Sequence, residues 1–136
     1  MPAPVVIYHK RDAARTQLET AIALWFRYAD PMAIHTLAAA ANEIYHGIGR
    51  TKGAPGIVQT FKKNLKTKRE KALLNQAQNF GKHANTDPDG TFRLQPEHAE
   101  LLLLDGVMTH ERLFRKRTAL MTCFFSRAHL RPDYSH

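Results

Sequence analysis

Cysteine is almost absent from this chain, because Cys123 is the only one among 136 residues. One cysteine cannot form a disulfide within the chain, and its apolar neighbours predict a small buried side chain. Zinc sites generally draw on several cysteine and histidine ligands, yet the chain has one cysteine and no His-Glu-x-x-His run. The lack of disulfides favours a reducing compartment, so we expect a cytoplasmic protein.

Long apolar runs and nucleotide-binding loops are also missing. The apolar run at residues 5–8 is too short for a signal peptide or a membrane span. No glycine-rich phosphate loop of a common spacing is present, and Ser126 and Ser135 are the only serines. We therefore expect no membrane partner and no cofactor, and we set serine and cysteine nucleophiles aside.

The chain does contain an ordinary share of apolar residues and an excess of positive charge. Hydrophobic residues make up 43% and charged residues 24%, which predicts a folded globular domain. Lysine and arginine number 20 against 12 acidic residues, for a formal net charge of +8. Such a surface attracts polyanions such as nucleic acid.

Hydrophobic periodicity predicts two helices in the first part of the chain. A helix over residues 11–29 is predicted, because apolar residues recur there at steps of three and four: Ala14, Leu18, Ile22, Trp25 and Ala29. Asp30 followed by Pro31 supplies an N-cap and a preset backbone angle, so a second helix begins there. The alanines at 38–40 leave room for another helix to approach closely. The expected buried stripe of the second helix is Ile34, Leu37, Ala41, Ile44 and Ile48.

Glycine and proline then predict a connection, and further helices complete the chain. Residues 47–58 contain Gly47, Gly49, Gly53, Pro55 and Gly56, which predict a flexible loop. Three more helices are expected: one in the basic segment 61–84, one from Pro96 through Met108, and one over 114–130. Residues 1–10 are expected to be extended. We predict a single all-α domain over residues 1–136, a bundle of about five helices.

Glu43 and His46 are the weak candidates for a metal site. They stand three residues apart on the second predicted helix, where a carboxylate and an imidazole can share one ion. A complete di-iron set needs a second unit of this kind, and none occurs in the sequence. We therefore predict no metal, and we expect the pair to hydrogen-bond to each other or to the neighbouring helix.

Two clusters of cations are candidates for contact with a phosphate backbone. The first lies in the basic segment and consists of Lys62, Lys63, Lys66, Lys68, Arg69 and Lys71. The second precedes the last predicted helix and consists of Arg112, Arg115, Lys116 and Arg117. The alternative is that these lysine-rich and arginine-rich faces only keep the domain soluble.

Asn79 and His83 lie four residues apart in the run Gln-Asn-Phe-Gly-Lys-His, and so share one face of the expected helix. A histidine beside a basic surface can take the proton of a ribose 2′-hydroxyl, or protonate a leaving oxygen, without any metal. The alternative is that His83 caps the helix, where the helix dipole favours a cation.

Residues 11–29, 33–45 and 78–83 together resemble the HEPN superfamily of small helical bundles. Many HEPN proteins are metal-independent endoribonucleases, whose motif is arginine, a polar residue, three further residues and histidine, with two motifs meeting across a dimer. The resemblance assigns Asn79 to the polar position and His83 to the catalytic position. Gln78 stands where the motif has arginine. Residues 33–44 and 79–92 also resemble a group of small uncharacterised bacterial proteins.

These patterns lead us to expect a homodimer that binds RNA, or a nucleic-acid-associated partner, through the segment 61–84. The sharper expectation is RNA cleavage, in which His83 is the acid or base, Asn79 orients it and Lys82 holds the strand. One alternative is a noncatalytic interaction module that associates through the helix around 101–104 or through its alanine face. A metal-binding bundle is the third possibility.

Overall fold

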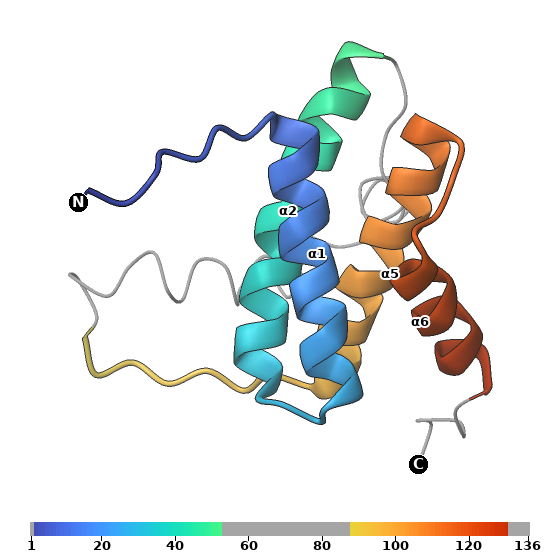
Figure 1. Ribbon diagram of the computed structural model, residues 1–136. Coiled ribbons are helices and arrows are strands. Elements are labelled where there is room, and N and C mark those ends of the chain that lie inside the picture. The colour runs from blue at the N-terminus through green and yellow to red at the C-terminus, as the bar shows by residue number, and fades with distance from the viewer. Residues whose placement is uncertain (1, 53–87, 131–136) are drawn as a thin grey trace.

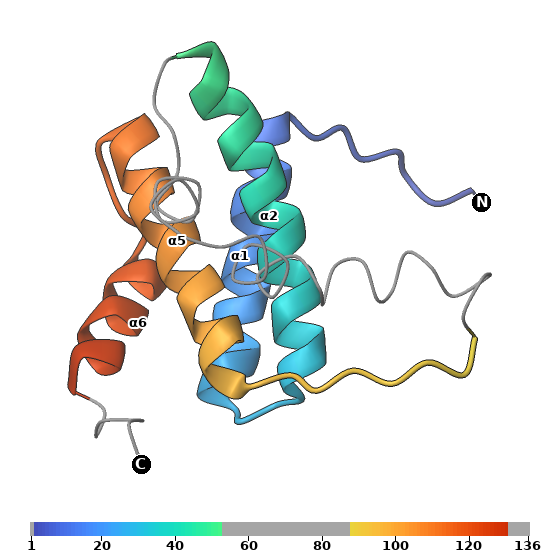
Figure 2. The same ribbon diagram turned by 180° about the vertical axis from the view of Figure 1, so that it is seen from behind.

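The computed structural model describes residues 2–52 and 88–130, which form four packed helices (Figure 1). They are α1 (Lys10–Phe26), α2 (Pro31–Thr51), α5 (Pro96–Phe114) and α6 (Ala119–Leu130). No strand occurs within these residues, so the all-α class is confirmed there. α1 runs antiparallel to α2, whereas α5 runs in the same direction as α2 (Figures 1 and 2). The helix predicted over 61–84 lies outside the described residues.

Residues 2–9 extend away from the bundle without regular secondary structure (Figure 1). α1 begins at Lys10, and the backbone carbonyl of His9 accepts hydrogen bonds from the amides of Asp12 and Ala13. In the part of the chain that is described, no helix is both long enough and apolar enough to cross a membrane.

A tight connection joins α1 to α2. α1 ends at Phe26, three residues before the predicted end, because Tyr28 adopts a left-handed backbone conformation with φ of 55°. The carboxylate of Asp30 accepts a hydrogen bond from the Met32 amide at 2.9 Å, and Pro31 opens α2. The predicted start of the second helix is therefore confirmed.

Part of the loop predicted over residues 47–58 is helical instead. α2 continues through Gly47 and Gly49 as far as Thr51. A glycine inside a helix costs about 1 kcal/mol relative to alanine. Gly49 is buried, however, and α2 packs against both α1 and α5 along its length. The packing of α2 thus outweighs its local helix propensity.

The buried face of α2 is rotated from the predicted stripe. Leu37, Ile44 and Ile48 are only half-buried. The apolar residues that face the core are Ile34, Ala38, Ala39, Ala41 and Tyr45. Because α2 lies between α1 and α5, its buried arc is wider than a single stripe and is centred between the two neighbours.

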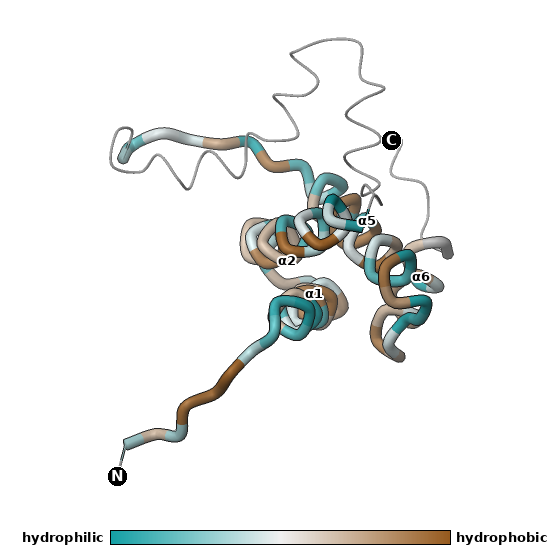
Figure 3. Tube along the Cα trace, turned by 90° about the horizontal axis from the view of Figure 1, so that it is seen from above, coloured by the Kyte–Doolittle hydropathy of each residue, from teal (hydrophilic) through white to brown (hydrophobic). Residues whose placement is uncertain are grey.

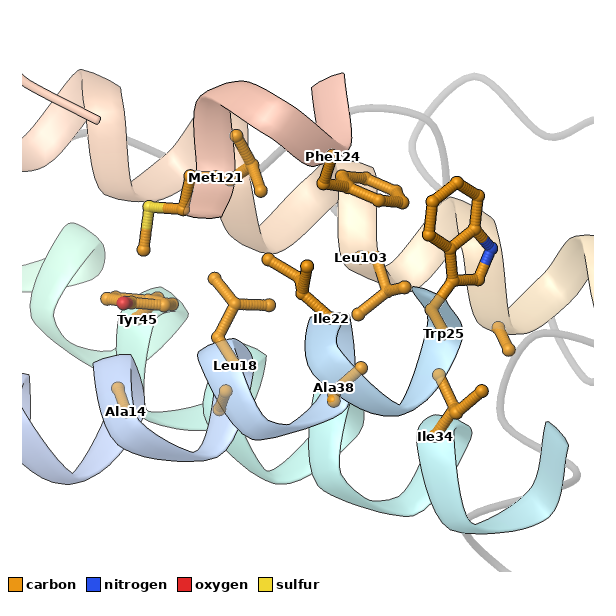
Figure 4. Packing of buried hydrophobic residues seen from close by; sticks show 14 residues of the cluster. Ala14, Leu18, Ile22, Trp25, Ile34, Ala38, Tyr45, Leu103, Met121 and Phe124 are labelled. Carbon is orange, nitrogen blue, oxygen red and sulfur yellow. The ribbon is translucent and has the colours of Figure 1, made fainter. Parts of the chain in front are cut away.

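The core lies where all four helices converge (Figure 4). Trp25 of α1 and Phe124 of α6 meet edge to face, with their ring centroids 4.7 Å apart. Gly106 of α5 lies so close to its neighbours that an added Cβ would come within 2.7 Å of Leu18 and 2.8 Å of Asn42. Gly106 therefore allows α5 to approach α1 and α2 closely.

The last two helices meet at a sharp break. α5 begins at Pro96 as predicted and ends at Phe114, the residue that was predicted to open the last helix. Arg115 then adopts a left-handed conformation with φ of 61°, and α6 begins only at Ala119. Cys123 is exposed rather than buried as predicted. It lies two residues after the buried Met121, and two residues turn a helix by about 200°, onto the opposite face.

Candidate nucleic-acid interface

One end of the bundle gathers most of the positive charge of the described residues. α1 begins at this end, and α2 and α5 finish there (Figures 1 and 2). Nine cations, which we call the basic end, lie in these stretches and in the link after α5: Lys10, Arg11, Arg15, Arg50, Lys52, Arg112, Arg115, Lys116 and Arg117. All of them are exposed except Arg117, which is half-buried.

Few acids balance the basic end. Arg15 contacts Asp12 at 3.5 Å and Glu19 at 3.8 Å. Arg117 pairs with Glu111 at 2.8 Å. Within residues 2–52 and 88–130, six of the nine cations have no acidic partner: Lys10, Arg11, Arg50, Lys52, Arg115 and Lys116. The basic end therefore carries a clear excess of positive charge.

The end of α2 positions Arg50 and Lys52. The Nζ atom of Lys52 lies 5.6 Å from the centroid of the Phe114 ring, a cation–π contact that connects the end of α2 to the end of α5. Sequence reasoning missed both cations because the glycines predicted a loop from residue 47 onward. A longer helix would have revealed them as part of its last turn.

The link between α5 and α6 carries the second predicted cluster. Nδ1 of His110 donates a hydrogen bond to the backbone carbonyl of Lys116 at 2.9 Å. The guanidinium of Arg117 lies 4.1 Å above the ring of Phe125 and also pairs with Glu111. The link is therefore held against both helices that it joins, and it presents Arg115 and Lys116 to solvent.

Helix dipoles explain only part of this arrangement. Cations near a helix C-terminus are stabilising by about 0.3–1 kcal/mol, and both α2 and α5 end here. Lys10 and Arg11 lie instead in the first turn of α1, where a positive charge is unfavourable. Local helix stability thus explains why Arg50 and Arg112 occur at their helix ends, but it does not explain why Lys10 and Arg11 occur at the start of α1.

Buried polar residues join α2 to α5 below the basic end. Nε2 of His46 donates to Oδ2 of Asp105 at 2.8 Å, and the hydroxyl of Thr109 donates to Oδ1 of Asp105 at 3.1 Å. His46 therefore pairs with the neighbouring helix, one of the two arrangements predicted for it, while Glu43 is exposed. Within the described ranges, no group of three or more histidine, cysteine or acidic side chains is arranged to hold a metal ion.

Two buried rings, Tyr45 and His110, lie beside this cluster with their centroids 5.7 Å apart. Burial lowers the pKa of His110, the hydrogen bond to the Lys116 carbonyl opposes this effect, and the charge of Arg15 adds to it. Burial raises the pKa of Tyr45, whose hydroxyl has no hydrogen-bond partner among the described residues. Both rings therefore stay neutral near neutral pH and add no charge to the basic end.

The other predicted site residues lie outside the described residues. They are the first cluster, Lys62, Lys63, Lys66, Lys68, Arg69 and Lys71, and the motif residues Gln78, Asn79, Lys82 and His83. The second cluster is described, and its members come together with the cations at the end of α2.

Comparison with protein-family models, with curated proteins and with solved structures finds no match for this chain. The resemblance to the HEPN superfamily therefore depends on residues 11–29, 33–45 and 78–83 alone. Functional conclusions must come from those runs and from the arrangement of charge in the fold.

Proposed function

We propose that this protein binds RNA through the basic end of its helical bundle. The observation that carries the proposal is the convergence of nine cations from three helices and one link at a single end, with few acids among them. RNA is proposed rather than another polyanion because the resemblance to the HEPN superfamily implies it. An HEPN-like bundle of about five helices, acting as a homodimer in the cytoplasm, is part of the same proposal.

The charge of the basic end suits a phosphate backbone. Six of its cations have no acidic partner among the described residues, so they can contact phosphates without breaking an ion pair. Lys10 and Arg11 lie at the start of α1, where the helix dipole makes a positive charge unfavourable. An external anion would remove that cost, which makes these two residues stronger support than the cations at helix C-termini.

The alternative, a noncatalytic protein-interaction module, has less support. It was expected to associate through the alanine face of the second helix or through the leucines at 101–104. Ala38, Ala39 and Ala41 are buried inside the chain's own bundle, and so is Leu103. The alanine face is therefore used within one molecule, whereas Leu101, Leu102 and Leu104 are only half-buried.

Binding of a labelled single-stranded RNA at several salt concentrations tests the proposal. If about six phosphates are neutralised, log affinity should fall against log salt with a slope near −4. The double variant Lys52→Glu, Lys116→Glu should bind at least about tenfold more weakly and show a slope shallower by about 1.4. Both side chains are exposed, and the only described contact that the variant gives up is the cation–π contact between Lys52 and Phe114, so the protein should still fold.

The matched control is Arg27→Glu, Arg93→Glu, which makes the same change in net charge on two exposed cations away from the basic end. It should change the affinity less than about threefold. Equal weakening by both double variants would show that net charge alone attracts RNA and would contradict a defined interface. Salt-insensitive binding would favour the interaction module.

RNA cleavage by His83 stays a prediction based on the resemblance. Incubation of RNA with the protein in EDTA, beside His83→Ala and a 2′-deoxy strand, checks it. Loss of cleavage in both controls is the expected result. Uncut RNA that is still bound would leave an RNA-binding protein without this activity, because Gln78 lacks the charge that arginine provides in the HEPN motif.

A further inference from the structure

An apolar segment precedes α1 and packs on nothing in its own bundle. Val5, Val6, Ile7 and Tyr8 are 90%, 65%, 88% and 60% exposed. Figure 3 shows these apolar residues, drawn in brown, in an extended segment that points away from the helices. Four consecutive apolar side chains in water are costly, and each aliphatic or aromatic one gains about 1.5–3 kcal/mol when it is buried.

A pocket of about 220 Å³ lies at the opposite end of α1. The turn between α1 and α2 and the start of α5 form it. Its lining is mainly apolar, with Trp25, Ala29, Pro31, Ile34, Pro96 and Ala99, and it also includes Tyr28 and the charged Glu100. Its volume is that of one or two aliphatic side chains. The pocket therefore matches the exposed segment in chemistry, and it has room for one or two of the four apolar side chains.

The segment cannot reach the pocket of its own chain. From Lys10 to Trp25 the helix advances about 22 Å. The chain from Val5 to Lys10 spans at most about 18 Å when fully extended, and that from Ile7 at most about 11 Å. Residues 5–8 can therefore enter this pocket only in a second copy of the chain.

The charges at the two ends of the bundle favour contact between the segment of one copy and the pocket of another. The exposed segment leads into Lys10 and Arg11 of the basic end. Around the opposite end, the described residues include four acids, Asp30, Asp89, Glu97 and Glu100, and three cations, Arg27, Arg93 and Arg127. If two copies lie with their α1 helices antiparallel, each basic end meets the more acidic end of the other.

We propose that residues 5–8 of one copy dock in the pocket beside Trp25 of a second copy, and that the exchange is reciprocal. A two-fold axis perpendicular to α1 places each segment next to the partner's pocket, so the assembly closes as a dimer. Both apolar segments are buried in this dimer and both pockets are filled. Because the partner's acids approach Lys10 and Arg11 in this dimer, these two cations serve the dimer contact as well as the proposed RNA interface.

Sedimentation velocity of the full chain over a wide range of concentration tests the dimer. The variant Val6→Asp, Ile7→Asp should raise the dimer dissociation constant by more than about 100-fold. These side chains do not pack in their own bundle, so the variant should fold normally. The matched control Pro2→Asp, Ala3→Asp adds the same charge to the same segment outside the apolar run, and it should dimerise like the wild type.

Fluorescence then tests the place of docking, because Trp25 is the only tryptophan in the chain and lines the pocket. Its emission should change as wild type and control dissociate on dilution, and should stay constant in the Val6→Asp, Ile7→Asp variant. A wild type that is monomeric throughout overturns the proposal, as does a dimer that survives the variant. A Trp25 emission that is the same in dimer and monomer also overturns it.

Discussion

Replacing Arg115 by glycine should stabilise the protein and weaken its binding to RNA at the same time. Arg115 holds φ at 61°, a conformation that costs a residue with a Cβ roughly 1 kcal/mol and costs glycine almost nothing. Its amide donates to the Glu111 carbonyl at 2.7 Å, and glycine keeps that hydrogen bond. Arg115→Gly should therefore raise the free energy of unfolding by about 0.5–1 kcal/mol.

The same substitution removes one cation from the basic end. If Arg115 contacts a phosphate, the slope of log affinity against log salt should become shallower by about 0.7. The affinity for single-stranded RNA at moderate salt should fall about two- to fivefold. Thermal unfolding measures the first effect, as a rise of about 2–4 °C in Tm. A salt series of RNA titrations measures the second.

Two controls separate backbone from charge. Arg115→Lys keeps both the charge and the left-handed strain, so it should leave stability and affinity nearly unchanged. Arg115→Ala removes the charge and keeps the left-handed strain, so it should weaken RNA binding without raising Tm. If Arg115→Gly lowers Tm, the strain argument is wrong. If it leaves RNA affinity unchanged, Arg115 is not part of the interface.

Two further predictions concern the half-buried His46 and the buried His35. His46→Leu should lower the free energy of unfolding by about 3 kcal/mol, because the fully buried Asp105 carboxylate loses the hydrogen bond from the imidazole ring. The double variant His46→Leu, Asp105→Leu should lose less stability than the single variant, because no buried carboxylate is left unpaired. Urea unfolding followed by circular dichroism measures both variants, and a larger loss in the double variant would contradict the argument. Burial lowers the pKa of His35 from 6.5, with nearby His98 adding to the effect, so below about pH 6.5 the unfolded chain binds a proton that the folded protein does not, and stability falls as the pH falls. His35→Gln should therefore flatten the decline of Tm on the acid side, and an unchanged pH profile would show that other groups cause it.

Much of the helical architecture could be predicted from local patterns. The steps of three and four in α1 placed Ala14, Leu18, Ile22 and Trp25 in the core, where the structure has them. The Asp-Pro start of α2 and the proline start of α5 depend on hydrogen bonds and backbone angles within a few residues, and both were predicted correctly. These features are determined by residues within about one turn of helix, so they can be predicted without knowing the tertiary structure.

The candidate site could be predicted only in part. The cluster at 115–117 is visible as consecutive letters, whereas Lys10, Arg11, Arg50 and Lys52 join it only because three helix ends coincide. The partner of His46 was equally hidden, since Asp105 lies 59 residues further along the chain. Sequence spacing on one helix pointed to Glu43, but the neighbouring helix supplied the carboxylate.

By itself the sequence determined that this chain forms helices, where two of them begin, and that it carries a net charge of +8. Local hydrogen bonding, side-chain periodicity and composition are sufficient for those properties. Only the tertiary structure decided that α2 continues through its glycines, that Cys123 faces outward, and that the cations collect at one end. These outcomes depend on which surfaces α1, α2, α5 and α6 bury against each other, and that free energy is shared among residues far apart in the chain.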